Sequence, residues 1–196
     1  MNDVLLNVVT GALREWLLSR GEPVVAGTSV RALVPISMRD DDAVVGNRVS
    51  SYLVDLPVGE PNPRVRLTRL SYAMRGTAQQ GRTVGADSLI ALTGFAPPTL
   101  HALGARAARS LSRRLFNLVV TNVPGPQVPL YAAGSRMLEV FPVVPLASGQ
   151  GLAVGMTSYH GRVFFGLNAD RDSVGDVDVL ADLIEQEVAE LVEAVG

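Results

Sequence analysis

The side chains best suited to proton transfer near neutral pH are scarce in this sequence. Only two of its residues are histidines, His101 and His160, and histidine is the usual general base in this pH range. His160 stands in a predicted hairpin turn, and His101 lies early in a predicted helix. Neither has a partner at metal-ligand spacing, so we interpret both as structural residues.

Several other chemistries are excluded by composition or lack a complete motif. The chain has no cysteine and no lysine, which rules out thiol catalysis, cysteine-ligated metal and a lysine base or Schiff base. The run Asp40–Asp42 could bind a cation, but three adjacent carboxylates are more typical of a solvated loop. Ser148 lacks a nearby histidine, and no phosphate-binding loop or Gly-x-Ser-x-Gly elbow is present. We therefore expect no metal site and no complete catalytic constellation.

Three polar features favour a binding or interface role. Asn2 and Asp3 open an apolar helix, although they could be an ordinary N-cap and first turn. Asn122 ends an apolar strand and precedes two prolines, whose fixed φ gives the loop a single shape, although a plain turn is the alternative. The glycines of 149-GQG-151 permit close backbone approach, although they could mark only a bend. The candidate binding or interface residues are Asn2, Asp3, Asn122, Pro124, Gly125 and Gln150.

Hydrophobic periodicity predicts the elements that position these residues. Apolar residues spaced three and four apart indicate helices, which we expect at 2–20, 64–80, 86–116 (broken at Pro97-Pro98) and 176–194. β-Branched and alternating runs indicate strands, which we expect at 30–39, 48–57, 116–121 and 137–144, followed by a hairpin of two alternating strands over 150–170. Helices packed on a mixed sheet predict an α/β, or layered α+β, domain over 1–196.

Two of the predicted helices have a clear inward face. In the helix at 64–80 the arginines are expected to point outward and the apolar residues inward: Val65, Leu67, Leu70, Ala73 and Met74. In the last helix the expected inward residues are Leu180, Ile184, Val188, Leu191 and Val192.

A basic stripe in the predicted helix 86–116 suggests contact with lipid. Arg106, Arg109 and Arg113 fall on one arc beside an arc of leucines. Basic residues next to an apolar face are typical of an interfacial helix on anionic lipid. The alternative is that the leucines face the core and leave these arginines solvated.

Overall composition limits the function classes further. The chain has 196 residues, of which 47% are hydrophobic, and a net charge of −2. This charge argues against a general nucleic-acid binder. No run reaches the roughly 18–20 apolar residues of a membrane span, and no N-terminal segment has the pattern of a signal peptide. We expect a cytoplasmic protein, with the stripe at Arg106, Arg109 and Arg113 as a candidate peripheral membrane or lipid-droplet contact.

Motifs along nearly the whole chain resemble the C-terminal domain of the bacterial wax ester synthase/diacylglycerol acyltransferases. Residues 2–6 (NDVLL) resemble the family's Asn-Asp-Val-Val-Leu motif. The block 31–39 (RALVPISMR) differs from the family's by Ile36, and 46–50 is GNRVS. The block 117–134 (NLVVTNVPGPQVPLYAAG) has Ala132 where leucine is usual, and Ser158 to Asp170 matches the family's ending.

The resemblance implies a fold and an activity. The fold would be the C-terminal half of a coenzyme A-dependent (chloramphenicol acetyltransferase-like) acyltransferase, with a tunnel between two similar halves. The activity would be acyl transfer from acyl-CoA to a long-chain alcohol or a diacylglycerol, with no permanently bound cofactor. The family's base is a histidine in an HHxxxDG motif of the N-terminal half, and this chain lacks that motif. We therefore expect an HHxxxDG-containing half as partner, and Asn122 held at the tunnel by the Pro-Gly-Pro loop.

Two alternatives remain open from the sequence. One is a non-catalytic lipid- or partner-binding module that kept the fold and lost the chemistry. The other is half of a peptide-forming condensation domain, which shares the superfamily, although the block 121-TNVPGP-126 argues against it.

Overall fold

One mixed sheet and the helices on one of its faces form the body of the protein. The computed structural model describes residues 2–37, 49–79, 83–84, 115–146 and 149–195. The six-stranded sheet has the order β3-β2-β1-β4-β7-β8. Its strands are β1 (Val30–Ser37), β2 (Val49–Leu56), β3 (Thr83–Val84), β4 (Leu118–Val123), β7 (Leu152–Tyr159) and β8 (Arg162–Ala169).

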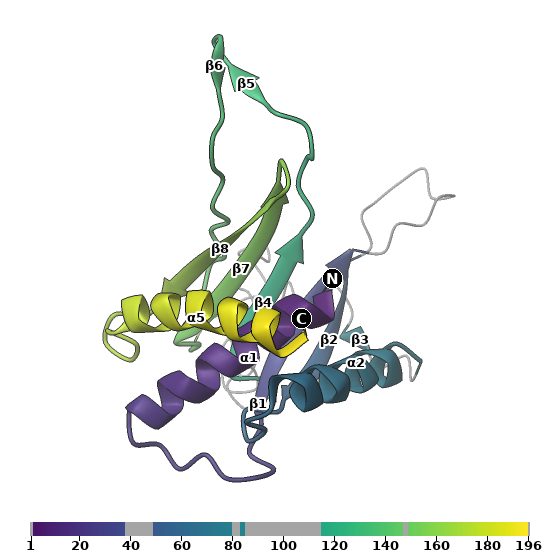
Figure 1. Cartoon of the computed structure of the whole chain (residues 1–196), viewed down its shortest axis with the longest axis vertical. Helices are drawn as coiled ribbons and strands as arrows, with labels where there is room; N and C mark the ends of the chain where they lie inside the picture. Colours follow the sequence, from purple (N-terminus) through teal and green to yellow (C-terminus); the bar gives the residue numbers. More distant parts are fainter. Residues whose placement is uncertain (1, 38–48, 80–82, 85–114, 147–148, 196) are drawn as a thin grey trace, which may run out of the picture.

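The pairing directions explain why the sheet is mixed. The central strands β1, β4 and β7 run parallel to one another, while β2 and β8 pair antiparallel to β1 and β7. A separate two-stranded ribbon joins β5 (Tyr131–Ala132) to β6 (Ser135–Arg136). Figure 1 shows this ribbon at the tip of a long arm that projects beyond the sheet.

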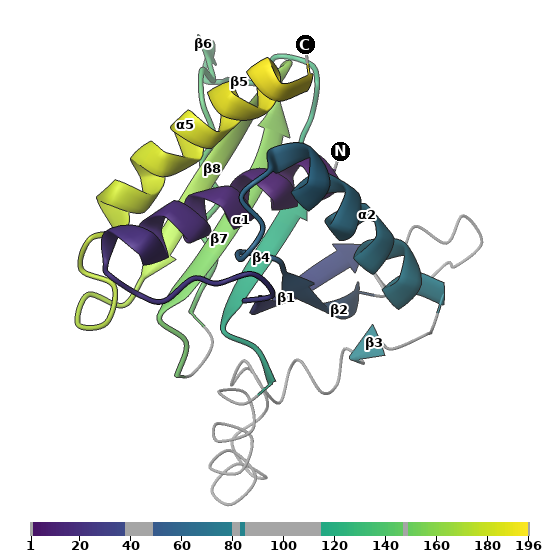
Figure 2. The same cartoon turned by 60° about the horizontal axis from the view of Figure 1, so that its bottom comes forward.

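Three helices cover one face of the sheet, as Figures 1 and 2 show. They are α1 (Asn2–Ser19), α2 (Pro63–Gln79) and α5 (Val177–Val195). The sequence predicted these three helices, and the layered α/β architecture, to within two residues at each end. The hairpin predicted over 150–170 is also confirmed, as β7 and β8 turning at His160-Gly161.

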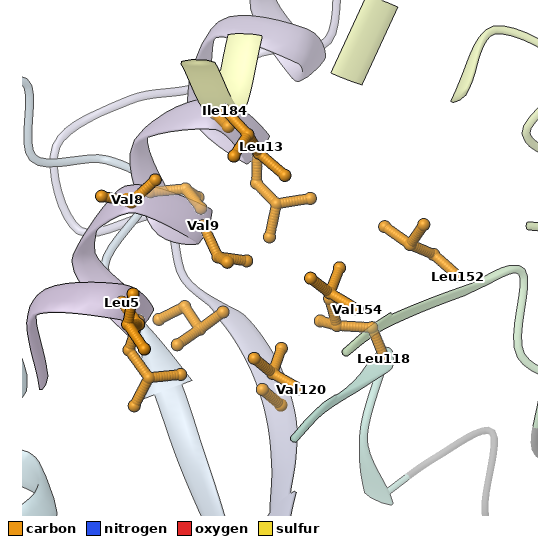
Figure 3. Close-up of a cluster of buried hydrophobic side chains, with 14 of the residues drawn as sticks. Leu5, Val8, Val9, Leu13, Leu118, Val120, Leu152, Val154 and Ile184 are labelled. Atoms are coloured by element: carbon orange, nitrogen blue, oxygen red, sulfur yellow. The ribbon is translucent and has the colours of Figure 1, made fainter. Parts of the chain in front are cut away.

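The main hydrophobic core lies between this helical layer and the sheet. Figure 3 shows side chains of α1, such as Leu5 and Val9, directed toward Val120 of β4 and Val154 of β7. Alternate residues of a strand point to opposite faces, so Val119 of β4 lies in a second, smaller cluster on the other face. This alternation also sets the direction of Asn122.

The junction of the three helices contains two charged side chains that were not predicted from the sequence to be buried. Arg66 of α2 and Glu187 of α5 are both buried and form an ion pair, and the Arg66 Nε also donates to Asn7 Oδ1 at 3.0 Å. The prediction that all arginines of α2 point outward is therefore wrong for Arg66. Burial raises the pKa of the Glu187 carboxyl, and the Arg66 guanidinium opposes that shift. Gly11 of α1 leaves the room for this pair, because a Cβ there would overlap both charged groups.

Three valines predicted to face inward are exposed instead. Val65 of α2 and Val188 and Val192 of α5 lie at the outer surface. Leu70, Leu180, Ile184 and Leu191 are buried as predicted, and the other predicted positions of α2, Leu67, Ala73 and Met74, are half-buried. The Arg66–Glu187 pair and its neighbours occupy the centre of the helix junction, so the helices turn these valines outward.

The strand predicted at 137–144 is wrong. This segment is extended but pairs with no strand among the described residues. Pro142 and Pro145 lack the backbone N–H that a ladder requires. The segment crosses the face of the β7–β8 hairpin instead, where Gly155 and Gly166 admit Pro142 at close range. It therefore covers the second face of β7, and all eight residues of β7 are buried.

Several predictions concern residues outside the described ranges. These are the helix expected at 86–116 up to residue 114, with His101, Arg106, Arg109 and Arg113, and also Asp40–Asp42 and Ser148.

Candidate functional site

The C-terminal end of β4 meets the start of α1 through two asparagines. Asn122 follows Leu118 and Val120 on the face of β4 that packs against the helices. Its side-chain Nδ2 donates to Asn2 Oδ1 at 2.6 Å. The bond joins residues 120 positions apart and is partly buried. Asn2 therefore ties the first turn of α1 to the sheet, in addition to starting the helix.

The neighbouring motif residue, Asp3, connects α1 to α2. Ser71 Oγ donates to Asp3 Oδ2 at 2.8 Å. Together the two residues of the Asn-Asp motif join β4, α1 and α2, and we call Asn2, Asp3, Ser71 and Asn122 the motif junction. Sequence reasoning missed Ser71, because a serine on a partly polar helix face carries no signal of its own.

The Pro-Gly-Pro loop after Asn122 is held against β7 and does not form a free turn. The Gly125 N–H donates to Ser158 Oγ at 3.2 Å, and Thr157 Oγ1 donates to the Val123 carbonyl at 2.8 Å. A Cβ on Gly125 would run into the backbone carbonyl of Ser158. Only glycine permits so close an approach, so Pro124 and Gly125 follow the end of β7.

Gln127 is a second residue that sequence reasoning missed. Its Nε2 donates to Ser158 Oγ and to the Gly125 carbonyl, each at 3.0 Å. Its Oε1 accepts from the Gly161 N–H at 3.1 Å. One side chain thus links the loop to the tip of the β7–β8 hairpin. The glycine and prolines just before Gln127 were the only sequence feature that could have pointed to it.

Gln150 does not join the motif junction. It is buried, and its Nε2 donates to the Phe116 carbonyl at 2.9 Å. The parallel register pairs Asn122 with Met156, in the second half of β7, whereas Gln150 lies two residues before β7 begins. Gln150 and Asn122 therefore lie near opposite ends of the paired strands β4 and β7.

We call residues 123–143 the arm: they run from the end of β4 to the projecting ribbon seen in Figure 1 and return across the face of the β7–β8 hairpin. The arm is rich in exposed apolar side chains. Val143 is 77% exposed and Leu138 71%. The other large apolar residues exposed along the arm are Val123, Val128, Leu130, Tyr131 and Phe141. Several exposed apolar residues on one segment make the arm a candidate interaction surface.

Tyr159 ties the two sides of the arm together next to the ribbon. Its buried hydroxyl accepts from the Leu130 N–H at 2.8 Å and donates to the Met137 carbonyl at 3.0 Å. The Met137 N–H also donates to the Leu130 carbonyl at 2.9 Å. The two sides of the arm are therefore joined at Leu130 and Met137 and fixed to the end of β7.

The motif junction can orient and bind groups, and it contains no histidine. It offers two amides, a carboxylate and a hydroxyl. His160 lies at the hairpin turn with a φ of 46° and is exposed, as the sequence predicted, and its N–H donates to the Pro126 carbonyl. Among the described residues, no three acidic or histidine side chains gather closely enough to hold a metal ion.

None of the helices in the described ranges combines the length and the hydropathy that crossing a membrane requires.

The chain matches the family described as WS/DGAT C-terminal domain over residues 45–192. It is 37% identical over 194 residues to the Mycobacterium tuberculosis (strain ATCC 25618 / H37Rv) protein named "Probable diacyglycerol O-acyltransferase tgs1". That match covers 98% of this chain and 42% of the relative. The chain thus spans about two-fifths of the length of the curated relatives it matches.

Solved structures agree on the fold. The "Wax ester synthase/diacylglycerol acyltransferase from Marinobacter aquaeolei VT8" superposes with a TM-score of 0.72 at 26% identity, covering 100% of this chain and 43% of that one. The epimerization domain from the third module of tyrocidine synthetase B gives a TM-score of 0.56 at 14% identity, covering 98% and 42%. The latter similarity shows the fold alone. The predicted fold, half of a larger acyltransferase-like architecture, is confirmed.

Proposed function

Because the chain belongs to the WS/DGAT C-terminal domain family, we propose that it forms the C-terminal half of an acyl-CoA-dependent O-acyltransferase. The complete enzyme, meaning this chain together with an HHxxxDG-containing half, transfers an acyl group to a long-chain alcohol or a diacylglycerol. Acyl-CoA is its substrate, and the reaction uses no permanently bound cofactor.

The observation that carries this proposal is the bond between Asn2 and Asn122. Each residue belongs to a different block of the family's motifs, and the two are far apart in the sequence, yet their side chains lie 2.6 Å apart. Ser71 extends the same contact to Asp3. A polar junction at the edge of the sheet supports a role in shaping the substrate tunnel from this side.

The chemical step divides between the two halves. The histidine of the HHxxxDG half removes the proton from the acceptor hydroxyl, whose oxygen attacks the thioester carbonyl. The new C–O bond forms, the C–S bond breaks, and the proton passes to coenzyme A, which leaves as the thiol. Our chain supplies tunnel wall and polar groups that hold the junction in place, and no base.

The arm is the surface that we assign to the half-to-half contact. Its exposed side chains, among them Leu138 and Val143, would lose water on docking, at about 25 cal/mol for each Å² of apolar surface buried. The relatives continue for more than half of their length outside the matched region, which supports a partner of that size. Tyr159 joins the two sides of the arm at Leu130 and Met137, which supports a defined shape of this surface.

We place the complete enzyme in the cytoplasm, at the periphery of a membrane or lipid droplet, because its proposed acceptors dissolve in lipid. A chain without a described membrane-spanning helix would reach them by surface contact.

A chimera tests the proposed function. This chain replaces the matched C-terminal segment of the Marinobacter enzyme, and acyl transfer to a long-chain alcohol and to a diacylglycerol is measured. We expect the chimera to be active, and the same chimera with the motif histidines changed to alanine to be inactive. A folded chimera without activity, but with retained binding of acyl-CoA or lipid, would instead favour the non-catalytic binding module.

A further inference from the structure

The outward face of α2 is basic along its whole length. The helix contains four arginines and no acidic residue, in a chain whose net charge is −2. One arginine, Arg66, is buried against Glu187. The other three, Arg64, Arg69 and Arg75, are exposed.

These arginines share their face with apolar and aromatic surface. At 100° per residue, Arg64, Arg75, Tyr72, Val65 and Arg69 fall within about 140° of arc. Tyr72 is 69% exposed and Val65 is 41% exposed. We call these five residues the α2 face.

The α2 face keeps its charge and holds its aromatic ring outward. Arg75 stacks on the Tyr72 ring, with 5.4 Å from its Cζ to the ring centroid, and its Nε donates to the Ser71 carbonyl at 3.2 Å. Arg64 donates to the Ala194 carbonyl at the end of α5. Only Arg69 has a carboxylate partner on this face among the described residues, Glu60 at 2.9 Å. Among the described residues, Arg64 and Arg75 therefore have no carboxylate partner, and both lie on the same face as the exposed Tyr72.

We propose that the α2 face binds the headgroup region of an anionic phospholipid surface. Arginines that surround a tyrosine and a valine on one helix face can bind a layer of lipid phosphate groups. Such a layer is planar, so binding to it requires no complementary cavity. Tyrosine favours the headgroup level, where its ring is in an apolar layer and its hydroxyl in water. An interface with a protein would need a larger apolar centre than one tyrosine and one valine provide. This inference deepens the peripheral location proposed above, but it does not depend on catalysis.

Vesicle co-flotation tests the inference with the whole chain. The probes are vesicles of phosphatidylcholine alone and vesicles that also contain phosphatidylserine. We expect binding only to the anionic vesicles, with an affinity that falls as salt is added. The double variant Arg64→Gln/Arg75→Gln should bind about 25-fold more weakly, since each basic residue near such a surface contributes about fivefold.

The control variant Arg20→Gln/Arg171→Gln removes the same charge from two exposed arginines outside α2 and outside the arm and should bind like the wild type. The melting temperature of each variant shows that it is folded. Failure of the wild type to bind anionic vesicles would overturn the inference, as would equal binding by Arg64→Gln/Arg75→Gln. If that variant loses only its association with the HHxxxDG half, the α2 face binds protein and the inference is wrong. Acyl transfer is not measured, so the outcome is separate from the test of the enzyme.

Discussion

The side-chain amide of Asn122, at the end of β4, donates to the side-chain oxygen of Asn2, in the first turn of α1, at 2.6 Å. This bond fixes the start of a helix against the edge of the sheet. Because the two motif residues bond to each other, replacing either one should also release the side chain of the other.

Replacing Asn122 with alanine should lower activity more than stability. Loss of one partly buried hydrogen bond costs about 0.5–1.5 kcal/mol, whereas a displaced junction should reduce acyl transfer in the complete enzyme by about tenfold or more. Melting temperature and initial rate are compared in the same preparation.

The matched control for that change is Asn117, just before β4. Its Oδ1 accepts from the Arg31 N–H at 2.9 Å, at the opposite end of β4. Asn117→Ala should lose a similar amount of stability and keep its activity. Equal loss of activity in the Asn117 and Asn122 variants would show that the junction has no special role.

Asp3 and Ser71 should be coupled. In a double-mutant cycle of Asp3→Ala and Ser71→Ala, the interaction free energy from chemical unfolding should be about 1 kcal/mol. Ser71→Thr keeps the hydroxyl and should restore most of the stability and of the activity of the complete enzyme. Strictly additive effects of the two alanine changes would contradict the coupling.

Serine substitutions on the arm should weaken docking of the HHxxxDG half without unfolding the chain. Val128→Ser, Leu138→Ser and Val143→Ser change residues that are exposed in the isolated chain, so the melting temperature should hardly change. Each lost apolar contact should raise the dissociation constant by about tenfold. Titration calorimetry or a labelled-partner assay gives this constant.

Val25→Ser and Val192→Ser are the controls for the arm. Both residues are 65% exposed but lie outside it, before β1 and in α5. Their dissociation constants should match that of the wild type. If arm and control variants weaken association equally, the arm is not the docking surface.

Two glycine-to-alanine changes should act in opposite directions. A Cβ on Gly11 would overlap Glu187 and Arg66 in the buried ion pair, so Gly11→Ala should lower the free energy of unfolding by about 1–3 kcal/mol. Gly76, also within a helix, has no atom within 4 Å of the added Cβ. Gly76→Ala should raise stability by about 0.5–1 kcal/mol. A Gly11 variant as stable as the wild type would contradict the packing of the helix junction.

Helices and strands were predicted best where the hydrophobic pattern depends only on residues close together in the sequence. The periodic stripe of α1 and the run of strand, turn and strand in β7–β8 predicted both elements. The 137–144 segment looked equally strand-like, although Pro142 within it and Pro145 just after it weaken a strand. Its position across the face of the hairpin depends on tertiary packing.

Contacts between distant elements could not be predicted. Arg66 and Glu187 look like surface residues of separate helices, and only the crossing of α2 and α5 buries them together. Asn2 and Asn122 were each recognised as candidates, but nothing in the sequence indicated that they bond to each other. Gln150 was grouped with them, although it lies near the opposite end of the paired strands β4 and β7.

The central claim is that this chain completes an acyltransferase whose base lies in another half. The most direct measurement is coenzyme A release from acyl-CoA, with a long-chain alcohol or a diacylglycerol present, by this chain alone, by an HHxxxDG half alone and by both together. We predict turnover only when both are present, and its loss when the motif histidines are changed to alanine. Turnover by this chain alone, or none from a folded complex of the two halves, would contradict the account.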